Sequence, residues 1–180
     1  MTTRTLETPP GAPPQVVVVM GVSGVGKSSV GLALAQRLGW VYAEGDDFHS
    51  TAAVAAMAAG RALTDADRMP WLLRIRDWVT QSLARGQSAV VTCSALRRTY
   101  RDVLRAGDGS VRFLLLELSE DELAARLSAR TGHFMPASLL ASQLATLEPL
   151  TSAERASGDV VVSASGPLPT VVDRAVEALF

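Results

Sequence analysis

The hydrophobic positions of the chain cluster in short apolar runs, which polar or amphipathic segments separate. The runs are rich in Val and Leu and are bounded by Gly, Ser and Asp, which is typical of strands. The predicted strands are 15–20, 40–43, 88–93, 111–118 and 159–163. The run at 111–118 is almost continuously apolar, as in the middle of a parallel sheet that is covered on both faces.

Between the runs lie segments with helix-forming residues. In 64–83 the apolar residues recur every three or four positions, the period of a helix that buries one face. These residues are Leu72, Ile75, Val79 and Leu83, with Trp71 and Trp78 alongside, and we interpret both tryptophans as core residues. Further helices are predicted at 29–38, 51–59, 137–144 and 169–179, after the turn at Ser94–Ala95, and after Ser119, which forms a capping box with Glu122.

Strands and helices alternate along the chain, which predicts an α/β fold with a five-stranded parallel sheet and helices on both faces. In such a sheet ligands bind at the carboxyl ends of the strands. The length of 180 residues fits one domain, which we place at 15–180. Residues 1–14 contain four prolines, so we expect a disordered tail, and the polar segment 151–158 is a predicted loop.

Composition narrows the class of partner. The net charge is −1, which gives no long-range attraction to nucleic acid or to an anionic membrane surface. No apolar run approaches the roughly 20 residues of a membrane span, and the N-terminus does not have the pattern of a secretory signal. Cys93 is the only cysteine, so no internal disulfide forms and we expect a cytoplasmic protein.

The segment from Gly21 to Ser28 reads G-x-x-x-x-G-K-S, the signature of a phosphate-binding loop, and it lies between a predicted strand and a predicted helix. Its glycines let the backbone approach a phosphate, and its N–H groups converge on phosphate oxygens at a helix N-terminus. Lys27, the only lysine, can reach the β- and γ-phosphates, and the Ser28 hydroxyl can ligate Mg²⁺. The predicted ATP site consists of Gly21, Ser23, Gly24, Val25, Gly26, Lys27, Ser28 and Ser29.

Three carboxylates, Glu44, Asp46 and Asp47, come directly after the strand at 40–43. Carboxylates at this edge of the sheet can hold the waters of a Mg²⁺ ion or orient a hydroxyl nucleophile. The alternative is a solvated acidic turn before the next helix. Because a phosphate loop precedes this segment, we favour a functional role for Asp46.

Several arginines stand at informative places. Arg68 lies in the first turn of the helix at 64–83, where a cation opposes the helix dipole, so it indicates an anionic partner or a salt bridge with Asp65 or Asp67. A later helix carries Arg97, Arg98, Arg101 and Arg105. The neutral overall charge favours a solvated face with one or two ligand contacts near the helix start over a nucleic-acid surface.

Arg126 and Arg130 are four residues apart on one helix face, and the break at 132–136 separates that helix from the next. A lid that closes over a triphosphate needs positive charge and mobility, so this helix–break–helix predicts a lid at about 126–145. Surface salt bridges are the alternative.

Several segments together resemble one family. They are Met20–Ser28, Gly45–Asp46 with His49, Met57 with Gly60, Leu63–Arg68 with Pro70–Leu72, Cys93–Arg98 with Tyr100–Arg101, and Arg130 with Gly132–Phe134. From about residue 16 to 150 the chain resembles the gluconokinases, small phosphate-loop sugar-acid kinases related to shikimate and adenylate kinases. The resemblance implies ATP-dependent phosphorylation of the C6 hydroxyl of D-gluconate, a strand order of 2-3-1-4-5 and a homodimer.

The resemblance also implies roles for individual residues. Lys27 and Ser28 would handle phosphate and Mg²⁺, and Asp46 would accept a hydrogen bond from the attacking hydroxyl. The gluconate carboxylate and hydroxyls would be held by Arg68, Arg98, the Ser94–Ala95 backbone, His49 and His133. Arg126 and the catalytic Arg130 would cover the nucleotide and neutralise charge in the transition state.

The chain departs from the family pattern at Ser50, Ala53, Ala56 and Ala62, all in the substrate-side helical segment. A kinase of another small polyhydroxy acid is therefore the near alternative. Shikimate is disfavoured because Cys93–Leu96 stands in place of the Gly-rich loop of shikimate kinases, and nucleoside monophosphate kinases are disfavoured because they have longer lids and different base-side contacts. A nucleotide-binding module without turnover is the alternative from another class. A GTPase switch is excluded because the chain has no Asn and so no N-K-x-D motif.

Overall fold

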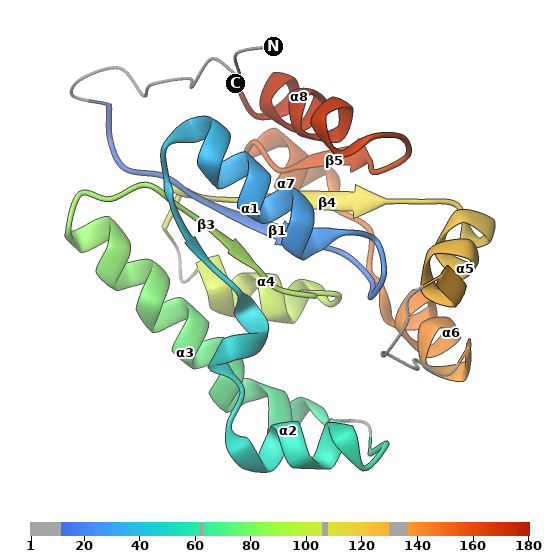
Figure 1. Ribbon diagram of the computed structural model, residues 1–180. Coiled ribbons are helices and arrows are strands. Elements are labelled where there is room, and N and C mark those ends of the chain that lie inside the picture. Colours follow the sequence, from blue (N-terminus) through green and yellow to red (C-terminus); the bar gives the residue numbers. More distant parts are fainter. Residues whose placement is uncertain (1–11, 62, 106–107, 130–136) are drawn as a thin grey trace.

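The central sheet has five parallel strands, as the sequence predicts. The structure is a computed structural model that describes residues 12–61, 63–105, 108–129 and 137–180 (Figure 1). Each strand lies within one residue of its predicted ends: β1 Val16–Met20, β2 Val41–Ala43, β3 Ala89–Thr92, β4 Val111–Glu117 and β5 Val160–Ser163. The strand order is β2-β3-β1-β4-β5, so the order implied by the resemblance is confirmed.

The alternating side chains of the middle strand separate two hydrophobic cores. β1 pairs in parallel with β3 and with β4, and all five of its residues are buried. Val17 and Val19 face one core, while Val16, Val18 and Met20 face the other. A strand with no exposed face needs a helical layer on each side.

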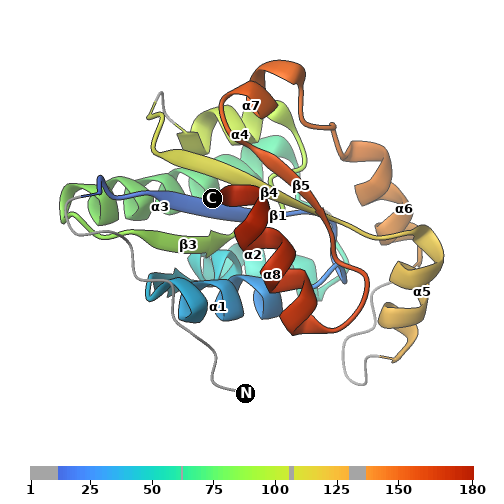
Figure 2. The same ribbon diagram turned by 90° about the horizontal axis from the view of Figure 1, so that it is seen from above.

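Helices supply these two layers (Figure 2). α1 (Lys27–Leu38) and α8 (Leu168–Leu179) pack on the face of Val17 and Val19, and α3 (Asp65–Ala84) and α4 (Arg98–Arg105) pack on the other face. Trp71 is buried and Trp78 packs against the same core, so the interpretation of both tryptophans as core residues is confirmed.

The described part of the chain contains further helices. They are the 3-10 helix η1 (Gly45–Phe48), α2 (Thr51–Ala58), α5 (Glu120–Ala129), α6 (Ala137–Thr146) and α7 (Ser152–Ala156). α2 buries none of its residues and projects away from the sheet (Figure 1). Of the predicted lid at 126–145, residues 130–136 lie outside the described part. Residues 1–11 of the predicted tail also lie outside it, and 12–14 form neither helix nor strand.

The prediction of a loop at 151–158 is wrong, because residues Ser152–Ala156 form α7. The Thr151 hydroxyl accepts from the Glu154 N–H at 3.2 Å, and the Glu154 carboxylate accepts from the Thr151 N–H at 2.8 Å. This reciprocal capping box stabilises a helix too short to show hydrophobic periodicity. Within the described ranges, no helix combines the length and apolar character that a membrane crossing needs.

Candidate active site

The phosphate loop connects the central strand β1 to α1, and its glycines adopt backbone conformations that other residues avoid. Gly21, Gly24 and Gly26 have φ values of 136°, 84° and 107°. At Gly24 a Cβ atom would also lie 2.8 Å from Leu127 Cδ2 of α5. The loop therefore keeps the open backbone cradle that phosphate binding needs.

Two polar groups of this loop contact the protein itself. Lys27 Nζ donates to the Val22 carbonyl at 3.0 Å. The Ser23 N–H donates to Gln143 Oε1 at 2.7 Å, so α6 lies against the loop. Sequence reasoning missed Gln143, since 120 positions separate it from Ser23 and no local pattern marks it.

Glu44 lies at the carboxyl end of β2, beside the start of α1. Tyr42 donates its hydroxyl to Glu44 Oε2 at 2.8 Å, and the Thr92 hydroxyl donates to the other carboxylate oxygen. Burial raises the pKa of Glu44, but hydrogen bonds from Thr92, Ser28 and Tyr42 and the charge of Lys27 outweigh it, so the pKa is below its usual value. An ionised carboxylate thus hydrogen-bonds Ser28, the predicted magnesium ligand.

The glycine between Glu44 and Asp46 allows this segment to touch the end of β3. The Gly45 N–H donates to Thr92 Oγ1 at 2.9 Å, and a Cβ atom at Gly45 would lie 1.8 Å from the Thr92 carbonyl oxygen. No larger residue fits there. The close approach brings Asp46, which is exposed in η1, to the same edge of the sheet as the phosphate loop.

His49 follows η1 and stacks on Trp71, with ring centroids 4.3 Å apart and an interplanar angle of 10°. Burial lowers the pKa of His49; the charges of Arg68 and Arg74 act in the same direction and Asp46 opposes them. The imidazole is therefore neutral at pH 7. Its Nδ1 is buried and has no hydrogen-bond partner among the residues that the structure describes.

The segment 94–98 joins β3 to α4 and touches the phosphate loop, because the Gly21 N–H donates to the Ser94 carbonyl at 3.3 Å. Ala95 has φ 42°, the one positive value among the described residues other than glycine. Backbone conformations of this kind persist where the surrounding structure enforces them and are frequent at binding sites. Ser94, Ala95 and Arg98 are all predicted site residues, and the structure brings them to the edge of the sheet where the phosphate loop lies.

Arg68 has no carboxylate partner within the described part of the chain. Its Nη1 lies 3.3 Å from the Tyr100 hydroxyl, which itself donates to Asp65 at 2.6 Å. Asp65 pairs with Arg97 and Asp67 with Arg61. The alternative of a salt bridge from Arg68 to Asp65 or Asp67 is therefore wrong.

Arg126 joins the phosphate loop to the segment after β5. Its Nη1 donates to the Val25 carbonyl at 3.1 Å and its Nη2 to the Ala164 carbonyl at 2.8 Å. The guanidinium thus lies beside the predicted nucleotide site. The predicted site residues Arg130 and His133 lie outside the described residues.

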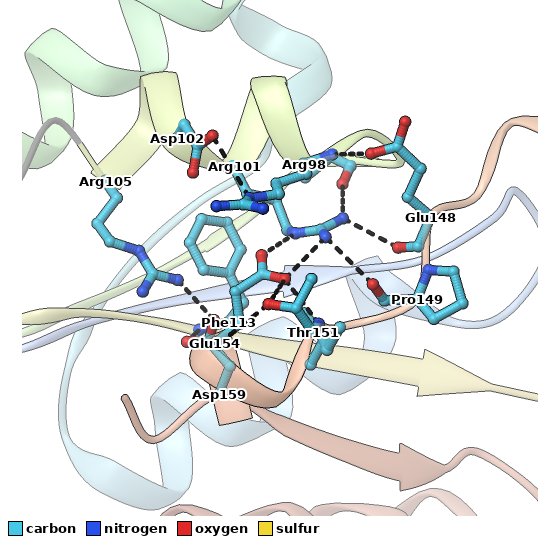
Figure 3. Close-up of polar contacts among 12 residues, drawn as sticks. Arg98, Arg101, Asp102, Arg105, Phe113, Glu148, Pro149, Thr151, Glu154 and Asp159 are labelled. Carbon is cyan, nitrogen blue, oxygen red and sulfur yellow. Dashed lines mark hydrogen bonds and ion pairs between the residues drawn. The ribbon is translucent and has the colours of Figure 1, made fainter. Parts of the chain in front are cut away.

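The prediction that the arginines of α4 form a solvated face is wrong for two of them (Figure 3). Arg101 is fully buried and pairs with Glu154 at 2.6 Å, and Arg105 pairs with the buried Asp159 at 2.5 Å. Both carboxylates come more than 50 residues later in the chain. A pattern confined to one helix cannot show partners at that separation.

Comparison with known proteins places the chain among phosphate-loop kinases. The family described as AAA domain matches residues 16–150. A gluconokinase of Gluconobacter oxydans is 54% identical over 142 residues, which cover 79% of this chain and 80% of that protein. The thermoresistant gluconokinase of Escherichia coli is 35% identical over 164 residues, covering 91% and 93%.

Solved structures of phosphate-loop kinases are also similar to this chain. A gluconokinase from Sinorhizobium meliloti superposes with a TM-score of 0.82 at 46% identity, covering 93% of this chain and 92% of that one. A shikimate kinase from Aquifex aeolicus shares the fold, with a TM-score of 0.58 at 14% identity over 92% and 96% of the two chains. By sequence and by structure, the chain belongs to the gluconokinase family.

Proposed function

We propose that this protein transfers the γ-phosphoryl group of ATP to the C6 hydroxyl of D-gluconate and releases 6-phospho-D-gluconate. One observation carries the proposal: the phosphate loop, the Glu44–Asp46 turn and the 94–98 segment follow the adjacent strands β1, β2 and β3 and meet at one edge of the sheet. A phosphate donor and a polyhydroxy acid can therefore bind side by side. The similarity to proteins named gluconokinase supports the choice of acid.

On the donor side, the loop N–H groups and Lys27 hold the phosphates of ATP, and Arg126 lies beside the nucleotide. The hydroxyl of Ser28 and the ionised Glu44 that hydrogen-bonds it are hard oxygen donors, which fit Mg²⁺. Ser28 and Glu44 would hold a Mg²⁺ ion on this side of the site, and its positive charge would offset the negative charge of the phosphates.

On the acceptor side, Asp46 accepts a hydrogen bond from the C6 hydroxyl and orients it toward the phosphate. A base with a pKa near neutrality is not required, since phosphoryl transfer depends mainly on position and electrostatics. His49, which stacks on Trp71 directly after η1, would hydrogen-bond a substrate hydroxyl as the resemblance implies. Arg68, Arg98 and the Ser94–Ala95 backbone hold the carboxylate end, and Arg130 and His133 complete the site as the resemblance implies.

A second acceptor is favoured by a cavity of about 240 Å³ between α2 and α3. Ser50 and Ala53 line it, and both depart from the family pattern; Arg61 and Arg74 also line it. Small side chains beside Arg74 and the ion pair of Arg61 with Asp67 leave room for an acid different from gluconate. A kinase of another polyhydroxy acid is therefore the second candidate.

The test is coupled ADP release from MgATP with D-gluconate, its epimers and shikimate, and with AMP and CMP as nucleotide acceptors. We expect fast turnover on D-gluconate alone. Fast turnover on another acid would show that the protein is a kinase and that its acceptor is that acid and not gluconate. Tight ATP binding with no turnover on any acceptor would indicate a binding module.

The homodimer and the cytoplasmic location belong to the same proposal. The first is expected from the resemblance and the second from the sequence. Light scattering of the purified protein tests the dimer, and a monomer at assay concentration would contradict it.

A further inference from the structure

Among the described residues, Arg101 is the largest side chain that is fully buried, and its side-chain hydrogen bonds lead to two segments (Figure 3). Its Nε donates to Glu154 Oε1 at 2.6 Å and its Nη2 to Glu154 Oε2 at 3.1 Å. The other donated bonds end on main-chain carbonyls: Nη1 on Glu148 at 3.1 Å and on Ala95 at 3.5 Å, and Nη2 on Pro149 at 3.4 Å. One guanidinium thus joins the 94–98 segment to the chain that leads from α6 to α7.

The same two segments are joined by Glu148. Its N–H donates to the Leu96 carbonyl at 2.8 Å, and its Oε2 accepts from the Arg98 N–H at 2.6 Å. Together with Arg101, these bonds hold the 94–98 segment at three points, at Ala95, Leu96 and Arg98. The positive φ of Ala95 is the kind of backbone conformation that persists only under such constraint.

The ion pair is fully charged. Burial opposes ionisation of Glu154, but its bonds with Arg101 and Thr151 lower its pKa to about 2. A buried charge pair adds little stability compared with apolar residues of similar size, so stability alone does not account for this arrangement. The planar guanidinium has several N–H donors, which bind the carbonyls of Ala95, Glu148 and Pro149. An apolar side chain has no such donors.

We propose that Arg101 is a positioning residue for the sugar acid. Paired with Glu154, it fixes the backbone of Ser94 to Arg98 against residues 148–149, so that the N–H and carbonyl groups and Arg98 meet the acceptor in one geometry. Arg101 does not touch the acceptor. The inference rests on the proposed function, since that function assigns the 94–98 segment to acceptor binding.

A second ion pair on the same helix provides a matched control. Arg105 Nη2 lies 2.5 Å from Asp159 Oδ2, and its guanidinium lies over the Phe113 ring at 5.1 Å. Asp159 Oδ1 also accepts the Phe113 N–H at 2.9 Å. This pair joins α4 to β4 and β5 and, among the described residues, makes no hydrogen bond to 94–98.

The experiment compares the double variant Arg101→Met/Glu154→Gln with Arg105→Met/Asp159→Asn. Each removes both charges, so no orphaned charge stays buried, and the amide introduced by Glu154→Gln keeps an acceptor for the Thr151 cap. We expect the first variant to raise the KM for D-gluconate by about tenfold, the effect of losing one or two well-placed hydrogen bonds. Its KM for MgATP should stay unchanged, and the control should change neither KM.

An unchanged KM for D-gluconate in the folded Arg101 variant would overturn the proposal, and so would equal increases of both KM values. Wild-type turnover is measured first: if another acid is the acceptor, its KM takes the place of that for gluconate. A wild-type protein without turnover on any acid counts against the proposed function and leaves no acceptor for Arg101 to position, so it overturns both.

Hydrogen exchange of the wild-type protein tests the proposal even where a variant fails to fold. Adding the acceptor should slow amide exchange both in 94–98 and in 148–154, because Arg101 joins them, and not in 158–163 near the control pair. Protection confined to 94–98 would show that acceptor binding does not stabilise 148–154 together with 94–98, and it would overturn the proposal.

Discussion

Lys27 is the single lysine of the chain, and the fold places its ammonium group in the phosphate loop, 3.0 Å from the Val22 carbonyl. In the proposed mechanism this ammonium group meets the charge that develops on the β- and γ-phosphates. We expect Lys27→Ala to lower kcat by about 10²- to 10³-fold, as for removal of one preorganised charge contact. Thermal unfolding should change little, because Lys27 belongs to neither hydrophobic core.

Steady-state kinetics on D-gluconate measure this effect. Arg37→Ala, at the other end of α1, removes a positive charge far along the helix and serves as the control. A wild-type kcat in Lys27→Ala would contradict the phosphate-loop mechanism.

Asp46 is exposed at the sheet edge, where a hydroxyl of the acceptor can reach it. We expect Asp46→Asn to lower kcat far more than it raises the KM for MgATP, because the amide is a poorer acceptor for the attacking hydroxyl. The neighbouring exposed Asp47 provides the control variant Asp47→Asn. An effect limited to ATP affinity would instead assign Asp46 to the magnesium shell.

At the scale of elements, α6 makes a hydrogen bond to the phosphate loop through Gln143. Gln143 Oε1 occupies the Ser23 N–H at 2.7 Å, and a phosphate oxygen would compete for that donor. We expect Gln143→Ala to lower the Kd for MgATP by about twofold to tenfold, the range for one hydrogen bond.

Gln143→Glu is the matched comparison, because it keeps the acceptor and adds a negative charge beside the phosphates. We expect it to weaken MgATP binding, which calorimetric titration measures directly. Weaker binding by Gln143→Ala would show that this side chain helps to hold the nucleotide and does not compete with it.

At the scale of the whole molecule, the pair of Arg101 and Glu154 makes stability depend on pH. The pKa of Glu154 is about 2 in the folded chain, whereas the ordinary value of 4.5 applies to the unfolded chain. Between these two pH values the unfolded chain therefore binds more protons than the folded chain. The resulting stabilisation, of about 3 kcal/mol, is complete above pH 4.5 and is lost as pH falls toward 2.

Urea unfolding from about pH 2 to 6 tests this dependence. The difference in unfolding free energy between wild type and Glu154→Gln should shrink as pH falls through that window. Asp173→Asn, which removes an exposed carboxylate from a pair with Arg37, is measured alongside as a control for the loss of one surface charge. A difference between wild type and Glu154→Gln that is constant with pH would contradict the expected linkage.

Most of the architecture could be predicted from the sequence, because each strand is a short apolar run and the long helix α3 shows apolar residues at helical spacing. The apolar run at 111–118 predicts a middle strand, and β4 does pair on both sides, with β1 and β5. Among the described residues two elements were missed, the 3-10 helix η1 and α7, because both are too short for a hydrophobic stripe. A capping box that includes Glu154 stabilises α7 instead. The phosphate loop could also be identified from the sequence, since G-x-x-x-x-G-K-S is a local motif.

Short local segments of the sequence therefore specify the α/β fold and the phosphate loop, and several such segments taken together specify the family. Only the tertiary structure decided which distant groups meet: Ser23 with Gln143, Glu44 with Thr92, and Arg101 with Glu154. These pairs lie 48 to 120 positions apart. The geometry that joins them arises from the packing of strands and helices and not from any pattern along one segment.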